Sequence, residues 1–244
     1  DTVNFTVLYA GATAGYTRWL VTNAANVTVG DLNYGSSYQA INTALATGIN
    51  YQLLNQTTLN SSGFIWGTWL TVSNTENWNF LDGSTDADLI IVRGTGNIYR
   101  GGASATDALY ANWSSATGGI AWSNAPTMDT TVNGVTVAGI ERMIITTGSG
   151  DDNINNVGGG NVGDEIRTGA GNDTVNGGAG NDIIDTGDND DVILGSAGID
   201  AVTAGAGNDT ITTSSSVGTI DGGSRQRHGE LHGAVRGCYS GIHP

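Results

Sequence analysis

Residues 159–212 read GGNVGDEIR TGAGNDTVN GGAGNDIID TGDNDDVIL GSAGIDAVT AGAGNDTIT, which is six consecutive units of nine residues. A further unit, TGSGDDNIN, covers residues 147–155, and the three residues 156–158 separate it from the others. Across all seven units the sixth position is aspartate and the eighth is isoleucine or valine. A fixed period held over this length indicates a repeat architecture in which each unit stacks on its neighbours.

Aspartates and glycines define each unit. The aspartates at the sixth position are Asp152, Asp164, Asp173, Asp182, Asp191, Asp200 and Asp209. The glycines of the preceding turns are Gly150, Gly160, Gly169, Gly171, Gly178, Gly180, Gly187, Gly198, Gly205 and Gly207. Glycine adopts the positive φ values of a tight turn. The Asp-x-Ile/Val-x segment that follows is expected to form a short strand whose aliphatic side chain points inward.

Two units complete one turn of a flattened right-handed spiral, so that unit n lies under unit n+2. One edge is then lined by Asp164, Asp182 and Asp200, and the other by Asp173, Asp191 and Asp209. Rows of carboxylates repel one another unless a cation lies between them. Calcium accepts six to eight oxygen ligands, including carboxylates and backbone carbonyls, whereas magnesium demands a tighter octahedron. The six uninterrupted units therefore predict about four calcium ions, bound by the aspartates and the glycine turns.

The units resemble the G-G-x-G-x-D-x-U-x nonapeptide of RTX (repeats-in-toxin, haemolysin-type calcium-binding) proteins. The resemblance covers residues 147–212 and implies a parallel β-roll with calcium between its turns, exported by a bacterial type I system. We therefore expect an all-β chain, a right-handed parallel β-roll of calcium-binding nonapeptides preceded by a β-rich N-terminal region. Val162, Asn189 and Ser196 replace expected glycines and would weaken individual sites. Without calcium, the same segment is expected to behave as a disordered acidic linker.

Weaker copies of the unit occur upstream. GSTDADLII at residues 83–91 places Asp88 at the sixth position, and GGASATDAL at residues 101–109 reaches Asp107 after one extra residue. Asp88 and Asp107 are therefore further candidate calcium ligands. The alternative is an ordinary strand around residues 89–92, bounded by glycine turns.

The chain is expected to divide into a β-rich N-terminal region of unknown type (1–80), degenerate repeats with a spacer (81–146), the calcium-binding roll (147–223) and an atypical tail (224–244). In the first 80 residues, β-branched and aromatic residues predict strands. These strands are expected at 4–9, 19–21, 27–29 and 65–72, with a short helix at 37–46. Asn133-Gly134 predicts a hairpin, and residues 141–145 predict a strand that leads into the first unit.

Charge and missing residue types exclude several functions. The net charge is −15 and all eight basic residues are arginines, which argues against nucleic-acid binding. No apolar run approaches the roughly 18 residues of a membrane span, so no transmembrane segment is expected. Every histidine and the single cysteine lie at or after residue 228, and the chain contains no lysine. We therefore expect no enzyme. A carboxylate pair could in principle hydrolyse glycosides, but no motif identifies one.

The tail, RQRHGELHGAVRGCYSGIHP at residues 225–244, abandons the repeat. We interpret it as non-native or out-of-frame sequence, or as an unusual terminus. His228 and His232 have the spacing of a metal pair on a helix, although the glycines disfavour a helix. The six tryptophans, all within residues 1–122, are more typical of a core than of a sugar-stacking face. Ice binding is disfavoured because the repeated turn lacks a regular threonine.

These observations predict a secreted or cell-surface bacterial protein whose roll folds when calcium binds and which serves as a structural or adhesive module. A surface or glycan partner would be of unknown identity. The alternative is an accessory C-terminal region of a secreted hydrolase exported by a type I system. The chain starts at Asp1 without an initiator methionine, which predicts a mature product or an excised fragment.

Overall fold

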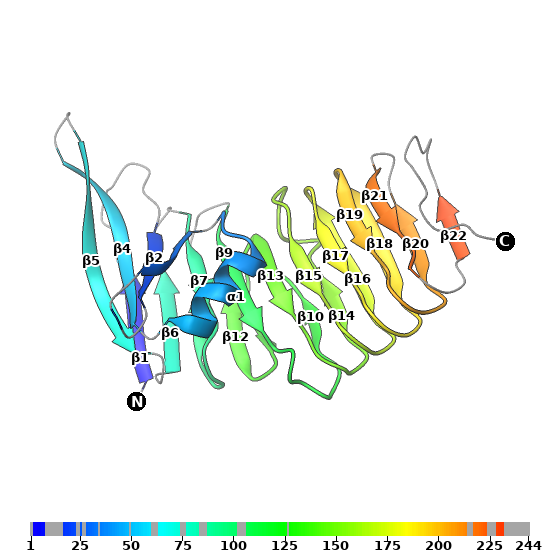
Figure 1. Cartoon of the computed structure of the whole chain (residues 1–244), viewed down its shortest axis with the longest axis horizontal. Coiled ribbons are helices and arrows are strands. Elements are labelled where there is room, and N and C mark those ends of the chain that lie inside the picture. Colours follow the sequence, from blue (N-terminus) through cyan, green and yellow to red (C-terminus); the bar gives the residue numbers. More distant parts are fainter. Residues whose placement is uncertain are drawn as a thin grey trace. The chain divides into compact units, whose positions relative to one another are not determined.

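The computed structural model of the chain (Figure 1) consists of strands and one α-helix in the part that it describes. The described residues are 2–7, 17–22, 25, 28–33, 35–48, 50–59, 63–73, 77–82, 87–101, 106–125, 127–213, 217–223 and 228–231. Two compact units share the chain: unit 1 contains residues 1–110 and 127–140, and unit 2 contains residues 111–126 and 141–244. The sequence-based boundaries at 80 and 146 do not coincide with this division.

Unit 1 contains a four-stranded antiparallel sheet in the order β3-β2-β4-β5 and the helix α1. The bounds are β2 Thr17–Thr22, β3 Thr28–Asn33, α1 Tyr38–Thr47, β4 Asn50–Leu59 and β5 Gly63–Ser73. The helix begins after Ser37, whose Oγ accepts the N–H of Ala40 at 3.3 Å. Ile41 and Ala44 are its buried residues. The expected helix is confirmed, while β4 was not anticipated from the sequence.

Unit 1 also contains a five-stranded sheet in the order β1-β6-β8-β12-β11. Its strands are β1 Thr2–Val7, β6 Asn77–Asp82, β8 Ile98–Arg100, β11 Thr130–Val132 and β12 Val135–Ala138. The β11–β12 pair is antiparallel and the other pairs are parallel. Asn133 and Gly134 join β11 to β12 with φ values of 42° and 77°, so the predicted hairpin is confirmed. Elsewhere in unit 1, β7 (Leu89–Ile91) pairs in parallel with β9 (Ala108–Asn112).

Unit 2 is a parallel β-roll, whose strands run as successive rungs in Figure 1. One sheet has the order β10 Ala121–Ser123, β14 Asn153–Asn155, β16 Thr174–Ala179, β18 Val192–Ala197, β20 Thr210–Thr213 and β22 His228–Leu231. The other contains, in order, β13 Arg142–Thr146, β15 Glu165–Arg167, β17 Ile183–Asp185, β19 Asp200–Thr203 and β21 Val217–Asp221. The chain alternates between the two sheets, so each unit pairs with the second unit after it. This confirms the predicted all-β parallel roll.

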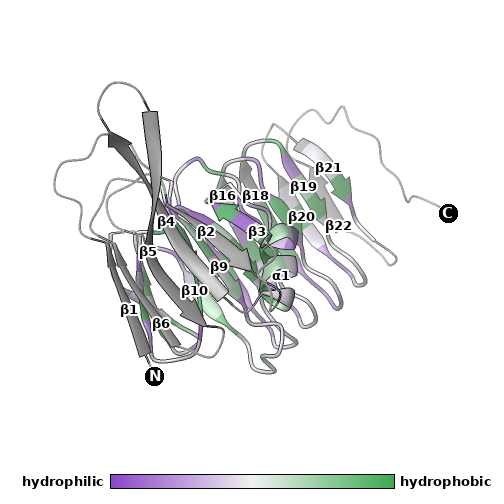
Figure 2. Cartoon of the chain, turned by 60° about the vertical axis from the view of Figure 1, so that its left-hand side comes forward, coloured by the Kyte–Doolittle hydropathy of each residue, from purple (hydrophilic) through white to green (hydrophobic). Residues whose placement is uncertain are grey.

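The aliphatic residues at the eighth position form the core of the roll. They are Ile154, Val175, Ile193 and Ile211 in one sheet and Ile166, Ile184 and Val202 in the other. All seven are buried, with at most 7% of the surface exposed. Figure 2 colours apolar segments along these strands green. Within each sheet these side chains lie in register on neighbouring strands, so the column is closed only by stacking.

The predicted strand at 141–145 is confirmed as β13, and two parts of the expected spacer, β10 and β13, belong to the first layer of the roll. Strand β10 pairs with β14 and places Trp122 opposite Ile154, while β13 pairs with β15 and places Ile145 opposite Ile166. Ile120 therefore stands at the sixth position of this layer, and the register places Met143 at the same position in β13. An apolar residue at the sixth position preserves the strand and the core, which is why a search for aspartate overlooked this layer.

The tail was expected to leave the repeat, yet residues 228–231 form β22 in parallel register with β20. An edge strand offers unpaired N–H and C=O groups that a following segment can occupy. Because His228 lies in a strand, it does not form a helical pair with His232, which is outside the described residues. Within the part of the chain that the structure describes, no helix has the length and apolar character needed to cross a membrane.

Candidate metal sites in the turns of the roll

The aspartates at the sixth position lie in two rows, one along each edge of the roll. All seven are buried, with at most 4% of the surface exposed. In one row, Oδ1 of Asp182 accepts the N–H of Asp164 at 2.9 Å, and Oδ1 of Asp200 accepts that of Asp182 at 3.0 Å. In the other row, Asp191 and Asp209 accept from the preceding aspartate at 2.9 and 3.1 Å. The period predicted these two rows, and the hydrogen bonds fix the direction of each carboxylate.

The second oxygen of the interior carboxylates distinguishes them from ordinary structural aspartates. Oδ2 of Asp173, Asp182 and Asp191 is buried and accepts no hydrogen bond from the described residues. The hydroxyls of Thr168 and Thr186 belong to the same edge as Asp173 and Asp191 but donate to backbone carbonyls at 3.1 and 3.0 Å. A buried carboxylate oxygen without a donor is costly. A bound cation would remove this cost, so the residues fit a metal.

The electrostatics of these carboxylates points the same way. Burial raises the pKa of Asp182 to about 6, an effect that the neighbouring carboxylate of Asp200 increases and the N–H of Asp164 opposes. Burial also raises the pKa of Asp191 to about 6. The N–H of Asp173 and the nearby hydroxyl of Thr186 oppose this rise, and the charges of Asp173 and Asp209 add to it. Each carboxylate is therefore reluctant to ionise beside its neighbours. A divalent cation between the turns would stabilise the ionised form.

The turns favour calcium over metals that require dense side-chain clusters. Among the described residues, no three histidine, cysteine, aspartate or glutamate side chains converge on one point. An ion between the turns would therefore need backbone carbonyl oxygens besides one or two carboxylates, which is a ligand set that calcium accepts. A further ladder occupies the turn N–H groups: Oδ1 of Asp151 accepts from Asn172 at 2.8 Å, and Oδ1 of Asp190 accepts from Asn208 at 2.7 Å.

The turn glycines are required for two different reasons. Positive φ values occur at Gly160, Gly169, Gly171, Gly178, Gly180, Gly187, Gly198 and Gly205. Gly150 and Gly207 lack a positive φ, so the expectation that glycine supplies it there is wrong. At these two positions a Cβ would overlap the backbone of Gly118 or Asn189 in the adjacent turn. Asn189 itself adopts a φ of 85° in place of a glycine. Whether the glycine carbonyls bind calcium stays a prediction.

Asp88 and Asp107 form a similar arrangement within unit 1. Both are fully buried, and the N–H of Asp88 donates to Oδ1 of Asp107 at 2.9 Å. A Cβ at Gly101 would overlap the side chain of Asp107, so glycine leaves the space that this carboxylate fills. The described parts of the weak upstream copies, residues 87–91 and 106–109, are therefore roll-like in structure. Their role as calcium ligands stays a prediction.

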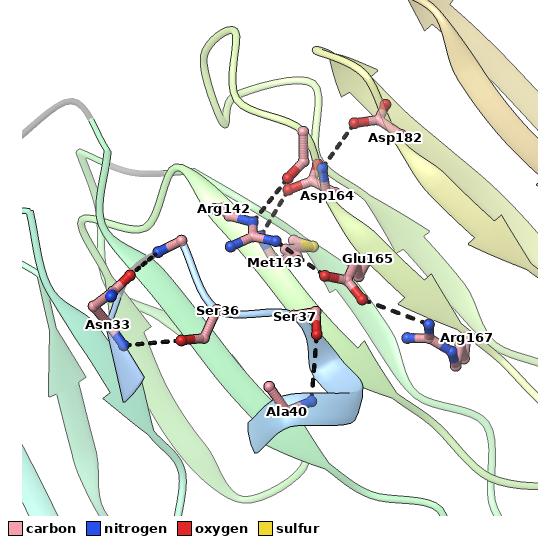
Figure 3. A network of polar contacts seen from close by, with 12 residues as sticks. Asn33, Ser36, Ser37, Ala40, Arg142, Met143, Asp164, Glu165, Arg167 and Asp182 are labelled. Carbon is pink, nitrogen blue, oxygen red and sulfur yellow. Dashed lines mark hydrogen bonds and ion pairs between the residues drawn. The ribbon is translucent and has the colours of Figure 1, made fainter. Parts of the chain in front are cut away.

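The polar groups around Asp164, the first aspartate of its row, were missed in the sequence. Asn156 belongs to the three-residue insertion, and its Nδ2 donates to Oδ2 of Asp164 at 2.6 Å. In Figure 3 Arg142 lies beside Asp164, and its Nη2 donates to Oε1 of Glu165 at 3.0 Å. Arg167 also reaches Glu165, with 3.5 Å between Nη2 and Oε2. The insertion itself was the available signal, because it interrupts a strict period at one point.

The stacked turns and their aspartate rows define a calcium-binding β-roll as the class of protein. A family model, the RTX calcium-binding nonapeptide repeat, matches residues 158–193 and 185–220. Residues 158–220 therefore carry calcium-binding repeats of RTX type, and proteins with such repeats are typically secreted. Neither a curated protein nor a solved structure matched the chain significantly.

Proposed function

We propose that this chain is a bacterial extracellular module whose roll folds when calcium binds and which then serves a structural or adhesive role at a surface. The observation that carries the proposal is the pair of buried aspartate rows, in which Asp173, Asp182 and Asp191 each retain a carboxylate oxygen without a hydrogen-bond donor. Ionised carboxylates in such rows destabilise the folded roll when no cation lies beside them. Calcium binding removes this destabilisation and so contributes to the free energy of folding.

The residues of the roll divide the work between them. The backbone N–H bonded to Oδ1 fixes each interior carboxylate and leaves Oδ2 of Asp173, Asp182 and Asp191 buried without a donor. Calcium, when bound, supplies positive charge and takes as ligands the buried oxygens that have no hydrogen-bond donor in the turns. The pairs of aspartates 18 residues apart, such as Asp173 with Asp191, predict about four ions in the uninterrupted units.

Calcium concentration would decide where the roll folds. A cell interior poor in calcium would leave residues 168–212 open, and an exterior with millimolar calcium would close them, consistent with the weak sites of extracellular modules, which have dissociation constants of roughly 0.1–1 mM. The net charge of −15 keeps the open segment soluble and disfavours its collapse.

A non-catalytic role is part of the proposal, because residues before 228 contain no histidine, cysteine or lysine. The experiment immobilises the chain on beads and measures retention of bacterial cells and of a glycan panel in millimolar calcium and in chelator. Retention that requires calcium supports an adhesive module. Turnover of ester, peptide or glycan substrates that persists in chelator would instead support the accessory region of a hydrolase.

A further inference from the structure

The first aspartate of each row differs from those that follow. Asp152 and Asp164 are both buried, with 2% and 1% of the surface exposed. Oδ1 of Asp152 accepts the N–H of Ile120 at 2.6 Å, and its Oδ2 accepts the hydroxyl of Thr147. Oδ1 of Asp164 accepts the N–H of Met143 at 2.7 Å, and its Oδ2 accepts from Asn156. Both oxygens of Asp164 therefore have donors of their own. The one hydroxyl proton of Thr147 is shared between Asp152 and the carbonyl of Thr168, which lies 3.0 Å from the hydroxyl oxygen.

The amide of Asn156 is held in place rather than free to leave. Its Oδ1 accepts Nδ2 of Asn124 at 2.6 Å, and its Nδ2 also reaches the carbonyl of Glu141 at 3.3 Å. Asn156 and Asn124 are 2% and 7% exposed. A Cβ at Gly159 would overlap the amide of Asn156, so the adjacent turn leaves room for this side chain only. The insertion at residues 156–158 thus places a fixed donor on Asp164.

A positive charge is built into the same layer. Arg142 is 9% exposed, and its Nε donates to the carbonyl of Gly163 at 2.9 Å. Its Nη2 pairs with Glu165, whose side chain is 7% exposed. Burial lowers the pKa of Arg142, while the charges of Glu165 and Asp164 raise it, so a cation and carboxylates stabilise one another in this layer. In the interior coils, by contrast, all charged groups on the aspartate rows are negative.

Apolar packing covers the core of the roll at the same layer. Trp122 is 1% exposed and lies opposite Ile154 at the start of the aliphatic column. The ring of Trp113 meets it edge-on, with 6.1 Å between the ring centroids. Two tryptophan rings therefore cover the first end of the column, and this packing does not involve a metal.

We propose that residues 118–124 and 141–167, here called the entry layer, fold without calcium and act as the template on which the interior coils, residues 168–212, fold when calcium binds. The inference rests on the proposed calcium-dependent function and adds a direction to it. In the entry layer, β14 and β15 are the strands with which the first interior strands, β16 and β17, pair in parallel. Each interior coil then adds to an ordered neighbour, which avoids the cost of nucleating a parallel sheet in open chain.

Amide hydrogen exchange of the full chain, followed by mass spectrometry of its peptides, tests this directly. In chelator, peptides from residues 141–167 are expected to exchange at least tenfold more slowly than peptides from residues 183–212. Adding millimolar calcium is expected to protect 183–212 as well. Equal, fast exchange of both segments in chelator would overturn the template. If calcium fails to protect 183–212 in the wild-type chain, the proposed function is wrong whatever the entry layer does.

The variant Asn156→Ala removes the donor to Asp164, and Asn161→Ala is its control because Asn161 is exposed in the same turn. Asn156→Ala is expected to lose the protection of 141–167 in chelator and to raise the calcium concentration needed to protect 183–212 at least threefold. Asn161→Ala is expected to match wild type. Should Asn156→Ala not fold even in calcium, Asn124→Ala is the second variant, because the Asn124 side chain donates to Oδ1 of Asn156 and leaves the donor to Asp164 in place. If either single variant folds and its residues 141–167 exchange in chelator as slowly as those of the wild type, the proposal is contradicted.

Discussion

The first coil of the entry layer, built from β10 and β13, and the coils that follow it share one backbone design but differ at one position. All have parallel strands in continuous register and an aliphatic or aromatic residue at the eighth position, from Trp122 to Ile211. At the sixth position the first coil carries Ile120 and Met143, whereas every later unit, including those of Asp152 and Asp164, carries aspartate. The comparison shows that these strands and the apolar column form without an aspartate at the sixth position. We therefore expect the sixth position to set the demand for metal.

The largest expected effect concerns the feature that the two regions share. Ile184 is 1% exposed in the column, while its neighbour Ile183 is 45% exposed. Ile184→Ala should lower the free energy of unfolding by about 2–5 kcal/mol even in saturating calcium, because it leaves a cavity. Ile183→Ala should change it by less than about 0.5 kcal/mol. Urea unfolding in calcium measures both. Equal effects would mean that the column does not stabilise the roll.

The next effect concerns the turns. Gly187 has a φ of 94°, and a Cβ there would overlap the carbonyl of Gly169. Gly187→Ala should therefore cost about 1–3 kcal/mol of unfolding free energy. A Cβ added at Gly118 in the entry layer would have no heavy atom within 4 Å, so Gly118→Ala is the control and should cost little unfolding free energy. If Gly187→Ala left the free energy of unfolding unchanged, the interior turns would not be packed as closely as the structure has them.

The third prediction separates metal demand from fold. Asp182→Asn removes a buried charge from an aspartate row, whereas Asp185→Asn removes the same charge from an exposed position. Asp182→Asn should raise the calcium midpoint of folding on the order of tenfold, because calcium affinity follows the ligand charge. Asp185→Asn should leave it within about twofold, since exposed charges contribute little. If the two variants shift the midpoint equally, calcium acts on the net charge and not at the rows.

The smallest effect is that of pH in the absence of calcium. The pKa values of Asp182 and Asp191 in the folded chain are about 6, above the ordinary 3.8. The folded state therefore binds more protons, and the resulting stability is complete below about pH 4 and is lost as the pH rises through 6. Circular dichroism of chelator-treated protein should show more β structure at pH 5 than at pH 8. The calcium midpoint should fall over the same rise in pH. The opposite trend in the dichroism or in the calcium midpoint would contradict the raised pKa values of the buried aspartates.

The strict repeat could be predicted from the sequence because each unit obeys the same two constraints. A buried aliphatic residue and a glycine turn recur every nine residues, so stacking, register and the aspartate rows followed from counting. The Asn133-Gly134 hairpin and the helix after Ser37 followed from local chemistry in the same way. These features depend on residues that are close together in the sequence.

The entry layer could not be predicted because its contacts join residues distant in the sequence. Asn124 lies 32 residues before Asn156, and Arg142 lies 23 residues before Glu165. Neither pair belongs to a motif, and the apolar residues at the sixth position of this layer break the pattern that identifies the roll. Likewise, β22 depends on the open edge of β20 and not on any repeat in residues 228–231. Pairing to an existing edge requires little of the sequence.

The central claim is that calcium drives the folding of the interior coils, and a calcium titration of chelator-stripped protein tests it most directly. Far-UV circular dichroism should show a cooperative gain of β structure within the millimolar range, with about four ions bound at saturation by equilibrium dialysis. Absence of any change up to ~10 mM calcium, beyond the range of weak extracellular sites, would contradict the account.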